Sequence, residues 1–453
     1  MIKFLPLGGA GEIGASCYYL NIDGTGILLD CGMHPQKTGL ESLPKFDLLK
    51  NEPLDYVLIS HAHQDHLNAL PFLVKKYPHI KIIATPQTRA LAELTLHNTI
   101  LILKRQMKEG EIEIYSHDEV DLLIKTIDYK SYGKKFVLTG LHSSNDLIEA
   151  EFFDAGHILG SASILIGHKD QKIFYTGDIN LSSQTILNGA ALPDNKINIL
   201  ITETTYGATD SSTLLNWDEE TERFAVSLNS VINKGGSVLI PVFALGKMQE
   251  ILATIWQMMK KNKLTLVNIF SGGIARKINR VYDYNIYTVN RNLKELILND
   301  IPQPDINDVT NSDDFFKSPS IVLAASGMMI ESTNSFNLAK RWLNQKDSAI
   351  FTVGYMDKDT PGFVVANART GDRIQLTETD KKTEIKCRIE NFRFSAHSRR
   401  EELISIVKKL NPENILLVHG DPEAMDWVGS QILKTFPNKK LYSPTVGKTI
   451  LFD

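Results

Sequence analysis

The residues best suited to chemistry in this 453-residue chain form one short run, His61-Ala62-His63-Gln64-Asp65-His66. In an extended or tightly turned segment His61 and His63 point the same way, so their two imidazoles can bind one metal ion. Asp65 and His66 lie beyond the turn into a helix and can face a second ion. We therefore interpret the run as a set of ligands for two divalent cations.

Two ions need more ligands than this run supplies, and a bridging carboxylate is the usual solution at a two-metal site. Asp178, which ends the segment Phe174-Tyr175-Thr176-Gly177-Asp178, is the expected bridge. His157 lies between glycines, and its loop offers a further imidazole. Six other histidines are expected to have structural roles: His34, His79, His97, His117, His142 and His168.

Strands of a sheet must position these residues, and the first two hundred positions are rich in short β-type runs. Several of these runs end next to a potential ligand, as expected of catalytic groups held on loops by a rigid sheet. The expected strands are 2–7, 17–22, 26–30, 56–60, 80–84, 149–154, 163–166, 173–175 and 197–202.

From about residue 208 the pattern changes to alternating strands and helices, which is typical of parallel βα units. Strands are expected at 237–241, 321–325 and 349–353, and a helix at 247–260. From about residue 380, strands at 384–389 and 414–419 flank a helix at 400–410. The fold class is therefore predicted to be α/β.

A glycine-rich segment, Gly9-Ala10-Gly11-Glu12-Ile13-Gly14, matches the dinucleotide-binding pattern, and Asp30 follows at the distance of a ribose-binding acid. That pattern requires a helix after the glycines. Here residues 17–22 indicate a strand, and Asp23-Gly24 indicates a hairpin turn. Dinucleotide binding is therefore not expected.

The composition is that of an ordinary globular protein, with no apolar run long enough to span a membrane and no signal peptide. Three widely spaced cysteines, Cys17, Cys31 and Cys387, are expected to be reduced, buried thiols of a cytoplasmic protein. A net charge of −4 argues against a surface that coats nucleic acid throughout, but it allows a local basic cleft. Candidate cations for such a cleft are Lys104, Arg105, Arg276, Lys277, Arg280, Arg399 and Arg400.

The ordered set of candidate ligands resembles the metallo-β-lactamase superfamily: Asp30, His61-x-His63-x-Asp65-His66, His157 and Asp178. Three later segments resemble its β-CASP branch, which processes nucleic acids: Thr202-Glu203-Thr204-Thr205-Tyr206-Gly207, Phe394-Ser395-Ala396-His397 and Leu417-Val418-His419-Gly420. The resemblance implies an αββα sandwich, residues 1–207 and 380–453, with an inserted β-CASP domain of parallel α/β type at 208–379.

The resemblance also implies roles for the individual residues. One zinc ion would be bound by His61, His63, His157 and Asp178, and the other by Asp65, His66, Asp178 and His419. Asp30 would orient a ligand, whereas Glu203 and His397 would form a hydrogen-bonded pair with His397 as general acid. Water that bridges two zinc ions has its pKa lowered from about 15.7 toward 7, so hydroxide is available to attack phosphorus.

The implied activity is that of a zinc-dependent ribonuclease acting on single-stranded RNA, as an endonuclease, a 5′–3′ exonuclease or both. The Phe-Ser-Ala-His form is most similar to the endonuclease subunit of the cleavage and polyadenylation machinery and its prokaryotic relatives, and His419 is typical of RNA-cleaving members. A minimal nuclease without additional RNA-binding segments is expected. Manganese or iron could replace zinc, and a homodimer is one arrangement that the sequence leaves open. The alternatives are a hydrolase of DNA or of a non-nucleic-acid substrate, and a non-catalytic RNA-binding scaffold.

Overall fold

The computed structural model describes residues 1–106, 114–141, 146–194, 196–309, 311–354 and 356–452, so His142 lies outside the described residues. The chain divides into two compact units. Unit 1 consists of Met1–Ser182, Gly189–Ser212 and His397–Asp453, and unit 2 consists of Ser183–Asn188 and Thr213–Ala396. The domain boundaries expected from the sequence stay a prediction.

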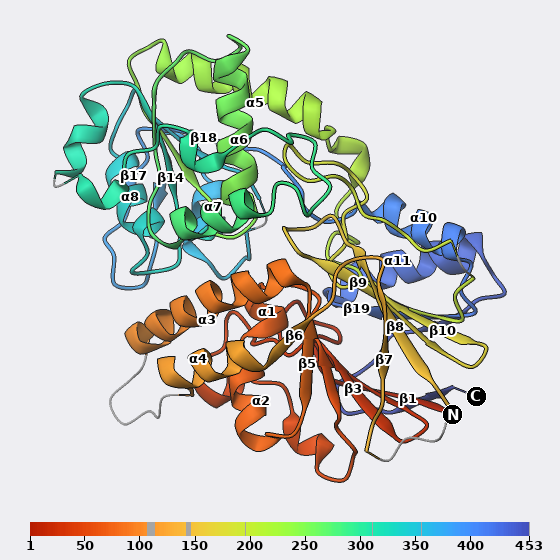
Figure 1. Ribbon diagram of the computed structural model, residues 1–453. Coiled ribbons are helices and arrows are strands. Elements are labelled where there is room, and N and C mark those ends of the chain that lie inside the picture. The colour runs from red at the N-terminus through yellow and green to blue at the C-terminus, as the bar shows by residue number, and fades with distance from the viewer. Residues whose placement is uncertain (107–113, 142–145, 195, 310, 355, 453) are drawn as a thin grey trace. The chain divides into compact units, whose positions relative to one another are not determined.

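Unit 1 contains two sheets of seven described strands each (Figure 1). The strands of sheet A are, in spatial order, β21 (Ile450–Phe452), β1 (Ile2–Gly8), β2 (Cys17–Ile22), β3 (Thr25–Leu29), β4 (Tyr56–Leu58), β5 (Lys81–Ala84) and β6 (Ile127–Tyr129). Those of sheet B are β20 (Lys440–Tyr442), β19 (Asn414–Val418), β11 (Ile199–Glu203), β10 (Gln171–Tyr175), β9 (Ala162–His168), β8 (Ile148–Asp154) and β7 (Lys135–Leu138). The strands expected in this part of the sequence are all present.

The two sheets face each other across one hydrophobic core. Sheet A contributes side chains such as Phe4 and Leu29, and sheet B contributes Phe152 and Ile201, all of them fully buried. Burying one such side chain stabilises a fold by about 1.5–3 kcal/mol, so this interface is a major source of stability. The core fixes how the strand ends of the two sheets meet, and it is these strand ends that carry the candidate ligands.

Helices cover the outer faces of the two sheets. Those that follow strands of sheet A are α1 (Gln64–Leu67), α2 (Leu70–Lys76), α3 (Pro86–Gln106) and α4 (His117–Thr126). On sheet B, α10 (Arg400–Leu410) and α11 (Pro422–Thr435) bury Leu403 and Val428 against Leu417 and its neighbours. Helix, sheet, sheet and helix follow in that order, which is the αββα sandwich that was predicted.

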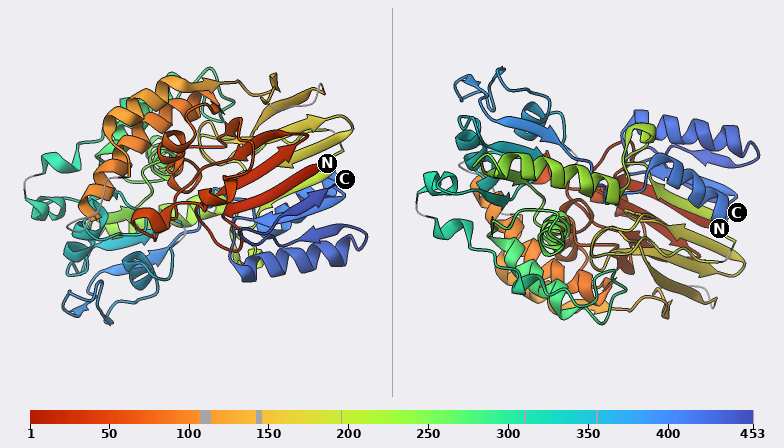
Figure 2. Two further views of the ribbon diagram at one scale, coloured as in Figure 1. Left: turned by 90° about the horizontal axis from the view of Figure 1, so that it is seen from below. Right: turned by 90° about the horizontal axis from the view of Figure 1, so that it is seen from above.

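The first and last strands of unit 1 are hydrogen-bonded neighbours. Ile2 pairs with Phe452 and Phe4 with Ile450 in antiparallel register, so the two labelled ends of the chain lie side by side (Figure 2). The C-terminal segment of unit 1 therefore contributes strands to both sheets, because β19 and β20 belong to sheet B.

The glycine-rich segment leads into a strand and not into a helix. Residues Cys17–Ile22 form β2, and the two-residue turn Asp23-Gly24 connects this strand to β3. Both turn residues have positive φ, 45° for Asp23 and 87° for Gly24, as the tightest hairpin turns require. The strand and hairpin turn predicted after the glycines are confirmed.

Unit 2 is built on a parallel sheet of five described strands, in the order β13 (Asn268–Phe270), β14 (Ser320–Ala324), β12 (Val238–Pro241), β15 (Ala349–Thr352) and β18 (Arg388–Asn391). A small antiparallel pair, β16 (Arg373–Ile374) and β17 (Thr383–Glu384), accompanies it. The helices are α5 (Trp217–Ile232), α6 (Lys247–Lys260), α7 (Ile274–Tyr284), α8 (Asn334–Trp342) and α9 (Pro361–Ala366). Residues 384–389 are not the single strand that was expected, because β17 ends at Glu384 and β18 begins at Arg388.

None of the described helices combines the length and apolar character needed to cross a bilayer. All three cysteines are buried free thiols, as expected from their spacing.

The buried carboxyl group of Glu250 in α6 should make the stability of unit 2 depend on pH. Its oxygens accept hydrogen bonds from the amides of Ile186 (2.7 Å) and Leu187 (3.1 Å), and burial raises its pKa to about 7. This pKa exceeds the unfolded value of about 4.5, so the folded state binds the proton more tightly. The contribution of Glu250 to the free energy of unfolding is therefore full at low pH and is lost as the pH rises toward 7. We expect Glu250→Gln to flatten this dependence, which amounts to at most about 3 kcal/mol.

Urea denaturation between pH 5 and 7.5 would measure this effect. Glu222→Gln is a matched control, because Glu222 lies on an exposed position of α5. Equal pH dependence of the unfolding midpoint in wild type and Glu250→Gln would contradict the prediction.

Candidate metal centre

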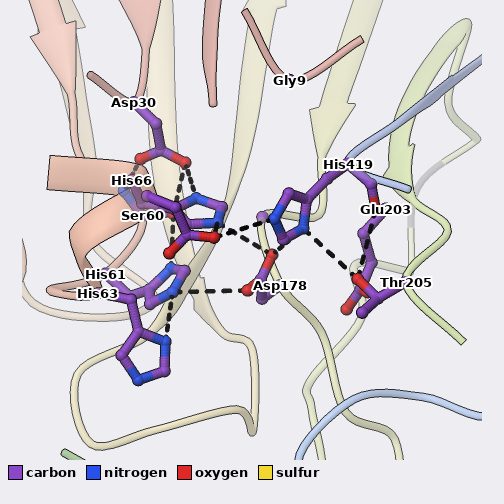
Figure 3. Close-up of polar contacts among 12 residues, drawn as sticks. Gly9, Asp30, Ser60, His61, His63, His66, Asp178, Glu203, Thr205 and His419 are labelled. Carbon is purple, nitrogen blue, oxygen red and sulfur yellow. Dashed lines mark hydrogen bonds and ion pairs between the residues drawn. The ribbon is translucent and has the colours of Figure 1, made fainter. Parts of the chain in front are cut away.

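The candidate ligands all follow the carboxyl ends of strands in unit 1 or lie on loops between them. His61 and His63 follow β4, and His63 is the N-cap residue of the short helix α1, which carries Asp65 and His66. The other candidates come from sheet B: His157 lies after β8, Asp178 after β10 and His419 after β19. Residues far apart in the sequence therefore meet at one end of the sandwich (Figure 3).

The first ligand set consists of His61, His63, His157 and Asp178. The Nδ1 atom of His63 lies 3.1 Å from Nε2 of His61 and 3.1 Å from Nε2 of His157. The Oδ2 atom of Asp178 lies 3.6 Å and 3.7 Å from the same two Nε2 atoms. Ligands at 2.0–2.1 Å from a tetrahedral zinc ion are about 3.3 Å apart, so these four residues fit one ion.

The second ligand set consists of Asp65, His66 and His419, with Asp178 beside them. The Nε2 atom of His419 lies 3.2 Å from Oδ2 of Asp65, and its Nδ1 atom lies 2.9 Å from Oδ1 of Asp178. The Nε2 atom of His66 lies 3.2 Å from that same Oδ1. Asp65, His66 and His419 therefore lie near enough to bind one ion, to which His419 can offer one of its two ring nitrogens.

Asp178 connects the two sets, because its Oδ2 atom faces the first and its Oδ1 atom faces the second. Its side chain is only 3% exposed, and Oδ1 has no hydrogen-bond donor of suitable geometry among the described residues. The buried Nε2 atom of His66 is likewise without a hydrogen bond. Buried polar atoms are rarely left in this state, and two cations would satisfy both.

The electrostatics of the centre favour positive charge. Burial works against a charged His66, but the carboxylates of Asp178, Asp65 and Asp30 outweigh it and raise its pKa well above the ordinary value. For His61, by contrast, burial and the neighbouring His66 lower the pKa. The side of the centre around His66 thus has the negative potential that attracts a cation, whereas His61 is held neutral, as a metal ligand must be.

Asp30, which is fully buried, orients two of the histidines. Its carboxylate accepts hydrogen bonds from Nδ1 of His66 (2.8 Å), from the amide and hydroxyl of Ser60 (2.6 and 2.7 Å) and from the hydroxyl of Tyr175 (2.6 Å). Ser60 Oγ also lies 3.0 Å from Nδ1 of His61. A carboxylate on the outer nitrogen fixes which ring nitrogen of a histidine faces the metal.

Replacing Asp30 by asparagine should weaken metal binding about 10- to 100-fold. The amide has one acceptor oxygen, whereas four donor groups converge on the carboxylate of Asp30. Competition with a chromophoric chelator would measure the loss. Asp55→Asn is the control, since Asp55 is also buried and accepts from the amides of Gly26 and Leu141; an Asp30→Asn protein with wild-type affinity would contradict the assignment.

Glu203 and His397 form a hydrogen-bonded pair beside the first ligand set. Nδ1 of His397 lies 3.0 and 3.1 Å from the two oxygens of Glu203, and the ring of His397 packs 4.5 Å from that of His157. Glu203 is held in turn by the amide of Ile179, at 2.7 Å. Burial works against protonation of His397, but the charge and hydrogen bond of Glu203 outweigh it and raise its pKa.

The glycine-rich segment after β1 holds two of the ligands. The carbonyl oxygen of Gly9 accepts hydrogen bonds from the amide of His419 and the hydroxyl of Tyr18, both at 2.8 Å. At the other end of the segment the amide of Ser16 donates to the carbonyl of Asp65 at 2.9 Å. Gly9 has a φ of 67°, and a side chain there would collide with Tyr18, so this position requires glycine.

Those histidines expected to be structural that the structure describes do not join the centre. His34 lies 3.5 Å from Glu12, His79 contacts the carbonyl of Leu54, and His97 contacts His117. His168 forms a group with Asp23 and Asp146, but the ammonium group of Lys169 already contacts both acids there, so this group is an ion-pair cluster and not a metal site.

Several supporting residues were not singled out from the sequence. Ser60 and Tyr175 bind Asp30, and Thr205 Oγ1 lies 3.4 Å from Nδ1 of His419 (Figure 3). Each is adjacent to a motif residue or lies within a motif, which was the available signal. Asp154, at the end of β8, instead accepts from the amide of Gly156 at 2.9 Å and lies outside both ligand sets.

An αββα sandwich that gathers histidines and aspartates at its strand ends defines a metallohydrolase type of protein. Three family models match successive parts of the chain: a metallo-beta-lactamase superfamily domain at residues 19–205, a Beta-Casp domain at 248–363 and a Zn-dependent metallo-hydrolase RNA specificity domain at 382–442. The chain belongs to the β-CASP branch of the metallo-β-lactamase superfamily. Membership of this family implies binding of a divalent metal.

Relatives of known name match nearly the whole chain. Integrator complex subunit 11 of Danio rerio is 30% identical, and the match covers 99% of this chain and 74% of the relative. Endoribonuclease YSH1 of Candida glabrata is 29% identical, with 97% and 57% covered. The chain spans about three fifths of the length of the first curated relatives it matches. A crystal structure of a protein of unknown function from Enterococcus faecalis has the same fold, with a TM-score of 0.59 at 13% identity over the full length of both chains.

Proposed function

We propose that this chain is a metal-dependent ribonuclease that hydrolyses phosphodiester bonds of single-stranded RNA. The observation that carries the proposal is the placement of the two Asp178 oxygens against two separate ligand sets, with the Glu203–His397 pair beside them. The description of one matching family model as an RNA specificity domain supports RNA as the substrate. The name of the Candida glabrata relative, an endoribonuclease, supports cleavage within the strand.

The residues proposed to hold two zinc ions are His61, His63, His157 and Asp178 for one, and Asp65, His66, Asp178 and His419 for the other. Imidazole-rich sets suit zinc, and manganese or iron are the alternatives. A bound pair of divalent ions would supply Lewis acidity and a water of lowered pKa.

The chain's own residues then have two tasks. The carboxylate of Asp30 accepts a hydrogen bond from Nδ1 of His66, so that Nε2 of this histidine faces Asp178. Glu203 engages Nδ1 of His397, so that Nε2 of His397 is the nitrogen that can donate a proton to the departing 3′-oxygen. Cleavage of this kind leaves a 5′-phosphate and a 3′-hydroxyl.

The test is incubation of the metal-loaded protein with one RNA sequence labelled at the 5′ end or at the 3′ end. Wild type should cleave both, Asp65→Ala should cleave neither, and the two product ladders distinguish internal cleavage from 5′–3′ degradation. Hydrolysis of a simple aryl phosphodiester without cleavage of any RNA would favour a different substrate. Protein without stoichiometric metal and without activity would favour a non-catalytic scaffold.

A cytoplasmic location is part of the proposal, and the three free buried thiols are compatible with a reducing compartment. A homodimer remains a hypothesis that sedimentation analysis would test.

A further inference from the structure

The helix α7 of unit 2 has one buried face and one exposed, basic face. Its buried residues are Ala275, Ile278, Asn279 and Tyr282, whereas Arg276, Lys277 and Arg280 are exposed. Residues three or four positions apart lie on one face of a helix, so these cations share a face with Tyr284 at the helix end. With Tyr287 in the following turn, they form what we call the α7 stripe: Arg276, Lys277, Arg280, Tyr284 and Tyr287.

The two tyrosines are unusually exposed. Tyr284 is 83% and Tyr287 91% accessible, and neither hydroxyl contacts a hydrogen-bond partner among the described residues. A tyrosine normally buries much of its ring, so two exposed rings within four residues of the chain favour a surface that is covered when a ligand binds.

The cations of the stripe are largely uncompensated. Lys277 and Arg280 have no carboxylate partner among the described residues, and Arg276, paired with Asp305 at 3.3 Å, is still 44% exposed. Asp283, on the same helix, directs its oxygens to the amides of Leu298 and Asn299, at 2.7 and 3.0 Å. The stripe is thus positive on a chain with a net charge of −4.

We propose that the α7 stripe binds single-stranded RNA, with Lys277, Arg280 and Arg276 contacting phosphates and the two tyrosines stacking on bases. Cations beside exposed aromatic rings are the combination with which proteins bind single strands independently of sequence. A protein-docking face would instead be expected to have an apolar centre depleted of charged residues, whereas three cations lie beside the tyrosines here. The proposal rests on the proposed function and adds a second contact region for the same substrate.

Of the seven cations considered for a basic cleft, Arg276, Lys277 and Arg280 share one exposed face of α7. Arg400, for example, forms ion pairs with Asp210 and Glu401. The side chain of Arg105 lies outside the described residues.

The test measures binding of a fluorescent oligouridine RNA to the Asp65→Ala protein, which should not digest it, at several salt concentrations. Adding Lys277→Gln and Arg280→Gln should weaken binding about tenfold at low salt and make the dependence of log K on log salt shallower by about 1.4. Tyr284→Ala or Tyr287→Ala should each weaken binding at least about fivefold without changing that slope, and phenylalanine at either position should restore it.

The matched control is Lys408→Gln with Lys409→Gln on α10, which removes the same charge from exposed positions of unit 1. An equal loss in this control would overturn the proposal, because net charge alone would then set the affinity. The proposal would also be overturned if the α7 variants bound RNA as tightly as the unsubstituted stripe does. The same holds if they lost self-association and kept RNA binding. If the variants bind normally while wild type cleaves RNA, only the α7 proposal fails; if wild type neither binds nor cleaves RNA, the proposed function fails as well.

Discussion

Replacing Asp178 by alanine is expected to lower RNA cleavage about a thousandfold or more and to remove metal from both ligand sets. The two oxygens of this one carboxylate face His61 and His157 on one side and His66 and His419 on the other. Loss of metal would forfeit several kcal/mol of charge stabilisation in the transition state, and each 1.36 kcal/mol corresponds to about a tenfold change in rate.

Metal content per chain and the cleavage rate, measured on the same preparation, would check this prediction. Asp23→Asn is the control, because Asp23 belongs to the other acid-and-histidine group, in which Lys169 contacts both acids. That control should keep wild-type metal content and rate. An Asp178→Ala protein that retains two ions per chain would disprove the bridging role.

Replacing His397 by glutamine should lower RNA cleavage by about 10²- to 10⁴-fold while leaving the metal content unchanged. Glutamine can still donate an N–H group to Glu203, but it cannot deliver a proton to a leaving oxygen. The rate on an aryl phosphodiester should fall much less, because a nitrophenolate leaving group needs no proton.

Comparison of the two substrates separates proton donation from structural damage. If His397→Gln lost the same factor on RNA and on the aryl ester, the general-acid role would be wrong. Glu203→Gln should show the same substrate dependence, and the double variant should be no worse than the more damaged single variant, because the two residues act as a unit.

Much of the fold could be predicted from the sequence because the strands are short, strongly apolar and bounded by turn residues. The hairpin at Asp23-Gly24 and the parallel βα pattern of unit 2 are local signals of this kind. The prediction of one strand at 384–389 was wrong. Ile385 and Cys387 alternate with polar residues and are buried, as in a strand, but the amides of Ile385 and Lys386 donate hydrogen bonds to the carbonyls of Asp372 and Leu343 and not to a neighbouring strand of the sheet. Register of that kind depends on tertiary partners, which a local pattern does not contain.

For the candidate site the sequence predicted the ligands but not the residues that hold them by hydrogen bonds. His61 to His66 is a local run, and its partners His157, Asp178 and His419 could be added only through the ordered resemblance to a family. No pattern indicated that Tyr175 would reach Asp30 from 145 positions away. Nor did the glycines of residues 9–14 reveal that a carbonyl among them would hold His419. Such contacts arise where two sheets meet, so they depend on the assembled core.

Unit 2 is inserted between segments of unit 1, so the two ligand sets are completed at different times during protein synthesis. Every residue of the first set has been incorporated once the ribosome passes Asp178. The second set also needs His419, which is translated only after all of unit 2. His397, the proposed proton donor, is also made after unit 2. A polypeptide truncated anywhere within unit 2 would therefore carry every ligand of the first set but would lack His419, which the second set needs.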